Sequence, residues 1–490
     1  MKFLAIVLLL ATSELAQQTE PKLLQLIAVC RHGVRASQNR IPKRACNPFN
    51  GKWGQVTNLG RRQNVLLGES LYNDSTYKTL FQPNGQYVGA RHLFLATDED
   101  KALMTGQSIF QGIFFKQWPS DDTEPTPTVP VRSETLNIDH VLMPSVTCSK
   151  KLDDLRKNIN QSDEWQEQDR MYDTYLEVIN KAAGFPDTAP KLTLMTVPRA
   201  AEQIILAYEH GYTSEADNCT YNDKKMDRTV IDLATWRNKI MNRPEDIEIA
   251  KIQISPFINE VVRRMNDTIN NVSNNQLVFY AADNANILAP LQLMGVESPG
   301  RAPFGSIFFF ELWNLDPSVT QAPYNLDNIG VKIGYRKFIS EGYNNTEGRP
   351  IVPIGLEDRV DISWFMNVTC NNHPFCTLSE LQKMVYTDSE WLKQCDLVET
   401  ASEKNKDTII IILAVLFGVA VIALILIIIG IIVIHIKHKS ERQREEEDDE
   451  EERLELRKDE REEQEKKRLE QVLNQQRLKQ SKVSTLKIYI

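Results

Sequence analysis

An uninterrupted apolar stretch near the C-terminus divides this chain into two parts that must fold in different surroundings. Residues 408–434 carry no charged side chain over 27 positions, and roughly 20 apolar residues are enough for a helix to span a bilayer. A buried core helix is the alternative, but such helices are rarely so long and so uniformly apolar. Lys437 and Lys439 follow directly, which favours a cytoplasmic location for a charged tail over residues 435–490.

The N-terminus and the glycosylation sequons agree with this topology. A lysine, a short apolar core and small residues predict a signal peptide over residues 1–17. The N-x-Ser/Thr sequons all lie between this segment and the apolar stretch, at Asn73, Asn160, Asn218, Asn266, Asn271, Asn344 and Asn367. We therefore expect a single-pass type I membrane glycoprotein. Its outer domain, residues 18–400, would lie at the cell surface or in a lysosome-like compartment.

All seven cysteines also lie in the outer region, where an oxidising compartment favours disulfides. Cys30 ends an apolar run and is interpreted as a buried free thiol. The other six could form three bridges, with fifteen possible connectivities. Metal ligation is the alternative, but the sequence has no C-x-x-C pair and no adjacent histidine cluster, so we predict no metal. A basic stripe with interleaved aromatics is also lacking, which disfavours nucleic acid as a partner.

The outer region, about 390 residues, is long enough for a substantial core. Strand-like and helix-like segments alternate along it, and this alternation predicts an α/β fold with a mainly parallel sheet flanked by helices. A polar, helix-prone segment at about residues 133–242 predicts a helical cap inserted into this fold. The strand-like segments are 23–30, 92–96, 276–282, 306–312 and 331–338, and the helical ones include 57–71, 98–115, 287–294 and 377–384.

The first strand-like segment ends in the sequence R-H-G-V-R at residues 31–35. Arg31 and Arg35 can hold a phosphate dianion with forked hydrogen bonds, and His32 between them can attack phosphorus. Gly33 lets the backbone turn and approach the anion closely. A basic surface turn is the alternative interpretation of so short a motif.

Further motifs resemble those of the histidine acid phosphatases, especially their membrane-anchored lysosomal and prostatic-type members. The family motif R-H-G-x-R-x-P is matched up to its proline, where this chain has Ser37. Residues 57–63 are similar to the family's T-x-L-G-x-x-Q, residues 97–104 to its T-D-x-D-R-T-L-M, and residues 310–313 to its F-E-L-W. The resemblance spans roughly residues 23–396.

The resemblance implies an α/β domain with a helical cap and a phosphohistidine mechanism that uses no cofactor. His32 would be the nucleophile, while Arg31 and Arg35 would hold the phosphate oxygens. It also implies the disulfides Cys148–Cys395 and Cys370–Cys376. Cys46 and Cys219 are left unassigned, and their pairing with each other is a guess.

Three of the six pocket groups that the resemblance implies are replaced in this chain. Leu95 stands where a third phosphate-binding arginine is expected, and Arg91 is too far back on the strand, about 13 Å, to substitute for it. The family's strand end Y-S-A-H-D becomes Y-A-A-D-N, so Asp283 replaces the second histidine and Asn284 replaces the acid. An amide cannot donate a proton to the leaving oxygen as a carboxylic acid can, and loss of a general acid typically costs about 10²–10⁴-fold.

Two hypotheses of different classes follow. The first is an acid phosphatase that hydrolyses phosphate monoesters through His32 and uses Asp283 as the acid at low pH. A carboxylate at position 283 would repel phosphate unless it is protonated. Alternation along a strand would also point it to the face opposite to that of residue 284, although strand ends are looser. The second is a pseudophosphatase, a membrane-anchored glycoprotein that binds a phosphate-like ligand or a partner, with a possible cytoplasmic partner for the tail. A phosphoglycerate mutase-like enzyme shares the R-H-G logic, but the signal peptide, sequons and expected bridges disfavour it.

Overall fold

The computed structural model describes most of the chain and divides it into two units. Described are residues 20–38, 53–81, 85–115, 129–182, 184, 191–210, 220–221, 224–225, 227–243, 245–341, 352–356, 360–361, 370, 373–397 and 401–485. The units are Met1–Val398 and Glu399–Ile490. The predicted signal peptide, Cys46 and Cys219 lie outside the described residues.

The first unit is built on a sheet with the strand order β11-β8-β7-β1-β6-β2-β3. β1, β6, β2 and β3 pair in parallel, whereas β7, β8 and β11 add antiparallel strands on the other side of β1. The α/β fold is therefore confirmed, and the sheet is mixed because β7 runs antiparallel to both of its neighbours, β1 and β8. The strands are β1 (Lys22–Arg31), β2 (His92–Thr97), β3 (Val131–Glu134), β6 (Leu277–Ala282), β7 (Ile307–Asn314), β8 (Ile329–Arg336) and β11 (Val360–Asp361).

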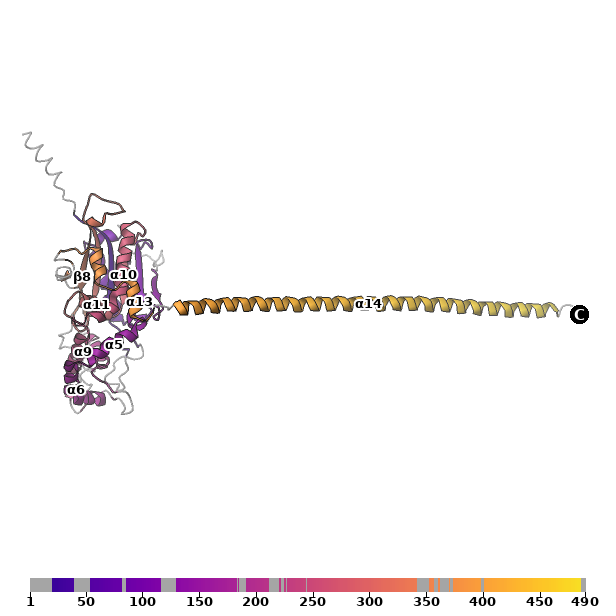
Figure 1. The fold of residues 1–490 in the computed structure, drawn as a ribbon, viewed down its shortest axis with the longest axis horizontal. Coiled ribbons are helices and arrows are strands. Elements are labelled where there is room, and N and C mark those ends of the chain that lie inside the picture. Colours follow the sequence, from indigo (N-terminus) through magenta and orange to yellow (C-terminus); the bar gives the residue numbers. More distant parts are fainter. Residues whose placement is uncertain are drawn as a thin grey trace, which may run out of the picture. The chain divides into compact units, whose positions relative to one another are not determined.

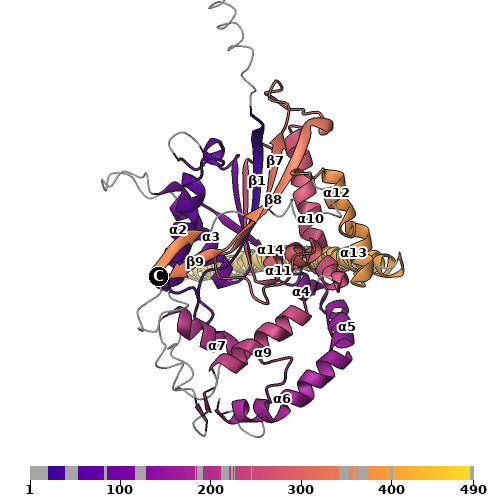
Figure 2. The same cartoon turned by 90° about the vertical axis from the view of Figure 1, so that its left-hand side faces the viewer.

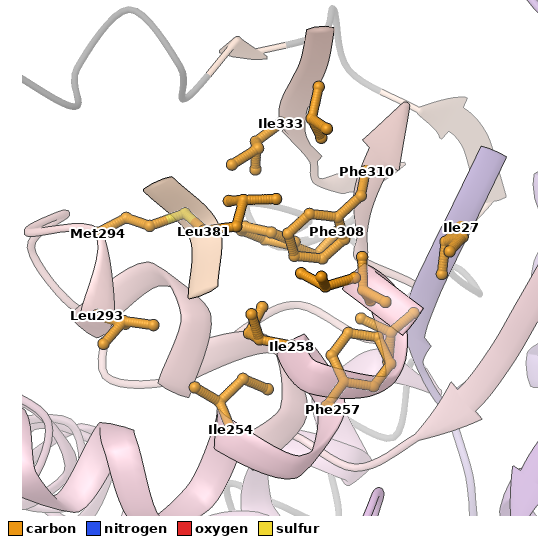
Figure 3. Close-up of a cluster of buried hydrophobic side chains, with 14 of the residues drawn as sticks. Ile27, Ile254, Phe257, Ile258, Leu293, Met294, Phe308, Phe310, Ile333 and Leu381 are labelled. Atoms are coloured by element: carbon orange, nitrogen blue, oxygen red, sulfur yellow. The ribbon is translucent and has the colours of Figure 1, made fainter. Parts of the chain in front are cut away.

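Helices cover both faces of this sheet, which explains why its central strands are apolar almost without alternation. Ile27 and Val29 of β1 pack in one cluster with residues of α10 (Ile247–Ile269), α11 (Ala285–Leu293) and α12 (Leu378–Lys383). Figure 3 shows Phe257 and Ile258 of α10 gathered with Phe308 and Phe310 of β7 in this cluster. The alternate β1 residues Leu26, Ala28 and Cys30 face α2 (Asn58–Asn73) and α3 (Asp100–Phe114) on the other side (Figure 2).

The start of α2 supports the loop that carries the R-H-G-V-R motif. Thr57 caps the helix by accepting a hydrogen bond from the backbone N–H of Gly60 at 3.3 Å. A Cβ atom at Gly60 would lie 1.9 Å from the carbonyl oxygen of Val34, so only glycine allows the helix to approach the motif this closely. Gly33 is similarly confined, because its Cβ would lie 2.5 Å from the side chain of Asn64.

The residues between β3 and α10 form a largely helical lobe with a hydrophobic cluster of its own, which includes Leu152, Trp165, Ile204 and Leu233. In Figure 2 its helices lie together at one end of the sheet domain. They are α4 (Pro144–Thr147), α5 (Ser149–Asn160), α6 (Asp163–Ala182), α7 (Pro198–Glu209) and α9 (Asp227–Ile240), with a small hairpin of β4 (Thr220–Tyr221) and β5 (Lys224–Lys225). The remaining elements are η2 (Lys78–Leu80), η3 (Leu326–Asn328), β9 (Phe338–Glu341), β10 (Val352–Leu356) and α13 (Asp388–Gln394).

One disulfide fastens the end of the first unit to the helical lobe, and a second closes a short local loop. Cys148 at the start of α5 joins Cys395 after α13, and Cys370 joins Cys376. These are the pairings that the resemblance implies. Cys30 is a buried free cysteine, as the sequence suggests.

The second unit is a single long helix, α14 (Ala401–Thr485), drawn from orange to yellow in Figure 1. Within it, Val415–Arg442 is long and apolar enough to cross a membrane, and an 18-residue window inside this stretch has a mean hydropathy of 3.4. This stretch overlaps the predicted span of residues 408–434. The charged tail continues as helix to residue 485.

Candidate active site

The parallel register of β1 and β6 brings two of the predicted site residues together. Arg31 lies opposite Ala282 at the ends of these strands, and the backbone N–H of His32 donates a hydrogen bond to the carbonyl oxygen of Ala282 at 2.9 Å. The next residue along β6 is Asp283, so the two chains leave the sheet side by side. Ligands of open α/β sheets characteristically bind at this carboxyl edge.

His32 is held in an orientation that suits a nucleophile. Its side chain is 2% exposed, and its Nδ1 lies 2.9 Å from the carbonyl oxygen of Gly33. The contact of Nε2 with ionised Asp283 requires the proton on Nε2. Once the carboxylate is displaced, the proton can instead sit on Nδ1 and be donated to the carbonyl oxygen of Gly33, which leaves Nε2 the lone pair needed to attack phosphorus. Burial lowers the pKa of His32 to about 3, although Asp283 acts in the opposite direction. The imidazole is therefore neutral at mildly acidic pH.

The two arginines of the motif are buried beside His32. Arg31 donates to the carbonyl oxygen of Ala302, and its guanidinium carbon lies 4.1 Å from the centre of the Phe304 ring. Burial, together with the like charges of Arg301 and Arg35, lowers the pKa of Arg31 well below its usual value. Arg35 donates to the carbonyl oxygen of Ala36 at 3.0 Å and forms an ion pair with Glu202 of α7.

Asp283 contacts the predicted nucleophile directly. Its Oδ1 lies 3.3 Å from Nε2 of His32 and 2.9 Å from Nζ of Lys101, which also pairs with Glu99 at 3.1 Å. Burial raises the pKa of Asp283, but the hydrogen bond to His32 and the charge of Lys101 outweigh burial, so the pKa lies below its ordinary value. Asp283 is 28% exposed, which makes it the more accessible member of the pair. An incoming phosphate must displace this carboxylate from Nε2.

The other two altered positions take no direct part in contacts with His32 that the structure describes. Asn284 accepts a hydrogen bond from the backbone N–H of Ala302 at 3.0 Å. Leu95 pairs with Tyr280 across β2 and β6 and packs against the hydrophobic cluster of α10. Arg91 lies at the amino end of β2, beside Gln276 in a cavity at the opposite edge of the sheet. It therefore does not replace the missing arginine.

A cavity of about 380 Å³ opens next to Arg31. It lies between the carboxyl edge of the sheet and helices α7 and α9, and it contains several charged groups that the motifs did not identify. Lys101, which contacts Asp283 and does not line this cavity, could be identified from the sequence, because it occupies the arginine position of the T-D-x-D-R-T-L-M motif. Arg301 and Glu202 carry no sequence signal. The lining residues are Arg31, Gln38, Pro198, Arg199, Ala201, Glu202, Ile205, Ala234, Thr235, Asn238, Asn284 and Arg301.

The sequence matches a known protein family. A family model described as the histidine phosphatase superfamily (branch 2) matches residues 22–324. The chain belongs to this family. Within the part of the chain that the structure describes, no group of three or more histidine, cysteine or acidic side chains could hold a metal ion.

Curated relatives are acid phosphatases. The chain is 24% identical over 324 residues to a lysosomal acid phosphatase of Xenopus laevis, which covers 64% of this chain and 71% of the relative. It is also 24% identical over 302 residues to a prostatic acid phosphatase of Bos taurus, which covers 59% of this chain and 73% of the relative. Histidine phosphatase superfamily membership and similarity to acid phosphatases support a phosphatase-like function.

Solved structures support the fold. A phytase from Citrobacter braakii matches with a TM-score of 0.50 and 15% identity, over 76% of this chain and 99% of that one. A Hafnia alvei phytase in complex with tartrate matches with a TM-score of 0.50 and 15% identity, over 77% and 99% of the two chains. At this identity the likeness concerns the architecture, a sheet flanked by helices with a helical cap.

Proposed function

We propose that the outer domain hydrolyses phosphate monoesters through a phosphohistidine at His32. The observation that carries this proposal is the placement of a neutral histidine between two buried arginines, with Nδ1 directed to the carbonyl oxygen of Gly33. In this arrangement Nε2 attacks phosphorus, a P–N bond forms and the P–O bond to the alcohol breaks. Water then hydrolyses the P–N bond, which releases inorganic phosphate and regenerates His32. Arg31 and Arg35 stabilise the charge on the phosphoryl oxygens.

The proposed mechanism needs an acid that donates a proton to the leaving oxygen. Asp283 is the acid nearest to His32, but Lys101 favours its ionised form. A bound phosphate dianion would raise the pKa of Asp283 because like charges disfavour ionisation. Asp283 therefore serves best as an acid at low pH and with substrate bound. Leaving groups that depart as stable anions, such as nitrophenolate, need no such proton.

A pseudophosphatase is the second candidate, and the contact between Asp283 and His32 favours it. The carboxylate lies 3.3 Å from the attacking nitrogen and is anchored by Lys101, so the resting site already holds an anion where a phosphate would approach. In that case the domain would bind a phosphate-like ligand without turnover. The charged tail would then provide contacts with a cytoplasmic partner.

We infer that the outer domain is exposed on the extracellular or lumenal side of a membrane, with Val415–Arg442 as the span. The distribution of sequons and the two disulfides support this topology. Protease added outside sealed microsomes tests it: we expect the tail to be digested and the outer domain, inside the lumen, to be protected, and the reverse pattern would refute the topology.

The enzyme hypothesis is tested with the full chain in detergent, using p-nitrophenyl phosphate between pH 4 and pH 7. We expect slow hydrolysis, an acid-labile phosphoenzyme, and loss of both in His32→Ala. His373→Ala is the matched control, because His373 is exposed and lies between Cys370 and Cys376. Cys376 pairs with Val331 near the start of β8, at the sheet edge opposite the site. Activity that survives in His32→Ala would refute the phosphohistidine mechanism. Vanadate binding without any hydrolysis would select the pseudophosphatase.

A further inference from the structure

The loop between α11 and β7 brings a further arginine to the site. Arg301 precedes Ala302, and the backbone of Ala302 is fixed on both sides. Its carbonyl oxygen accepts a hydrogen bond from Arg31, and its N–H donates to Asn284 at 3.0 Å. The backbone next to Arg301 is thus fastened to the motif that carries His32. Arg301 also lines the cavity beside Arg31.

Phe304 holds three site groups around one ring. The guanidinium carbons of Arg31 and Arg301 lie 4.1 Å and 4.4 Å from the ring centre. The imidazole of His32 lies 5.5 Å from the same centre. Phe304 itself is 2% exposed, so it forms a fixed platform. The two guanidinium carbons lie at most about 8.5 Å apart, the sum of their distances from the ring centre, and a tetrahedral oxyanion placed between them can accept hydrogen bonds from both.

The electrostatics agree with an anion between these arginines. Burial is the main reason why the pKa of Arg31 is lowered. Among the neighbouring cations, Arg301 lowers this pKa more than Arg35 does. Two carboxylates of α7 partly offset the repulsion between these cations. Glu202 pairs with Arg35. Burial raises the pKa of Glu209, but the charges of Arg301 and Arg31 favour its ionised form. An oxyanion that bridges Arg31 and Arg301 would remove the repulsion that remains.

We propose that Arg301 supplies the third guanidinium of the phosphate site, the group that Leu95 no longer provides. The ligand class is a tetrahedral oxyanion, namely a phosphate monoester or an analogue such as vanadate. Arg301 reaches the site from the loop before β7, whereas the missing arginine would have come from β2. This inference rests on the proposed function, because it concerns the same phosphate.

The test compares vanadate affinity in the full chain, Arg301→Gln and Arg301→Lys, by inhibition of p-nitrophenyl phosphate hydrolysis and by direct titration. Removal of a charge-assisted hydrogen bond to an anion weakens binding by about tenfold to hundredfold. We expect that loss in Arg301→Gln and a smaller one in Arg301→Lys, which keeps the charge but not the fork. Arg263→Gln is the matched control, because Arg263 is 58% exposed and pairs with Glu260 and Asp267 on α10.

The outcomes separate the inference from the function on which it rests. If wild type binds vanadate and Arg301→Gln binds it equally well, the role of Arg301 is refuted and the phosphatase hypothesis stands. If wild type neither binds vanadate nor hydrolyses the substrate, both fail. Thermal unfolding of each variant shows whether it folds. If Arg301→Gln does not fold, Arg301→Lys decides, since affinity equal to wild type at all ionic strengths would contradict a forked contact.

Discussion

Asn284→Asp should restore the proton donor that this site lacks. The asparagine side chain accepts a hydrogen bond from the backbone N–H of Ala302 at 3.0 Å, and an aspartate of the same shape accepts it equally well. Residue 284 also stands at the N-cap position of α11, where a carboxylate is favoured by the helix dipole. The substitution should therefore leave the fold unchanged and alter the chemistry alone.

The size of the effect depends on the leaving group. A general acid contributes typically about 10²–10⁴-fold, and only where the departing oxygen needs a proton. We expect the lower end of that range, about 10²-fold in kcat/KM, for an alkyl phosphate, because the new carboxylate lies next to Asp283 and adds repulsion toward the dianion. The same repulsion raises the pKa of the carboxyl pair, whereas the helix dipole and the Ala302 N–H lower that of residue 284, so the gain should be largest at the acidic end of the range. For p-nitrophenyl phosphate we expect less than about a tenfold change.

The assay measures kcat/KM for glycerol 2-phosphate and p-nitrophenyl phosphate between pH 4 and pH 7. Asn284→Ala is the control, because it removes the hydrogen bond to Ala302 without adding an acid, and it should not raise activity on either substrate. The reasoning is refuted if folded Asn284→Asp hydrolyses p-nitrophenyl phosphate as wild type does yet gains nothing on the alkyl ester. In that case residue 284 does not face the leaving oxygen.

The sequence predicts the framework of this domain because the framework follows local patterns. Apolar runs bounded by polar segments marked the sheet strands β1, β2, β6, β7 and β8 within a few residues of their observed ends. The sequence did not indicate that β7 runs antiparallel to its neighbours β1 and β8, since strand direction depends on how the chain returns. The patterns also do not predict helix α10, which packs on one face of the sheet together with α11 and α12.

The site was predictable where residues are neighbours in a motif and unpredictable where they meet only in the fold. Strand alternation suggested that Asp283 would point to the face opposite to that of residue 284, although strand ends are looser. The structure places its Oδ1 3.3 Å from Nε2 of His32, because β6 ends at Ala282 and alternation no longer applies beyond that residue. Arg301 and Glu202 belong to a loop and a cap helix with no periodic signal. Their approach to Arg31 and Arg35 is a tertiary contact that a single sequence does not encode in any local pattern.

Two further predictions test the charges around the site and the core. Glu202→Gln removes the ion pair with buried Arg35. Thermal stability without ligand should therefore fall, and vanadate affinity should rise several-fold because the anion no longer competes with the carboxylate. An unchanged affinity would show that Arg35 does not contact the anion. Asp139 is buried, and burial raises its pKa from 3.8 to about 6. The folded protein therefore holds a proton that an unfolded aspartate would lose, and stability from this group falls as pH rises from about 4 to above 6. Asp139→Asn should thus unfold at a higher temperature than wild type at pH 7 and at a similar temperature at pH 4, and equal unfolding temperatures at both pH values would contradict the shift.

The cations of the described site are already paired with carboxylates, and this pairing affects the free energy of phosphate binding. Arg35 is paired with Glu202, and Lys101 is paired with Asp283 and Glu99. A phosphate dianion must compete with these carboxylates, so its binding free energy is the difference between two charge-paired arrangements. Protonation of a displaced carboxylate makes that exchange easier, because a neutral acid no longer competes for the cation. Acidic conditions would then promote the first step, entry of the phosphate, as well as protonation of the leaving group. A preference for low pH can therefore arise in this site even where Asn284 donates no proton.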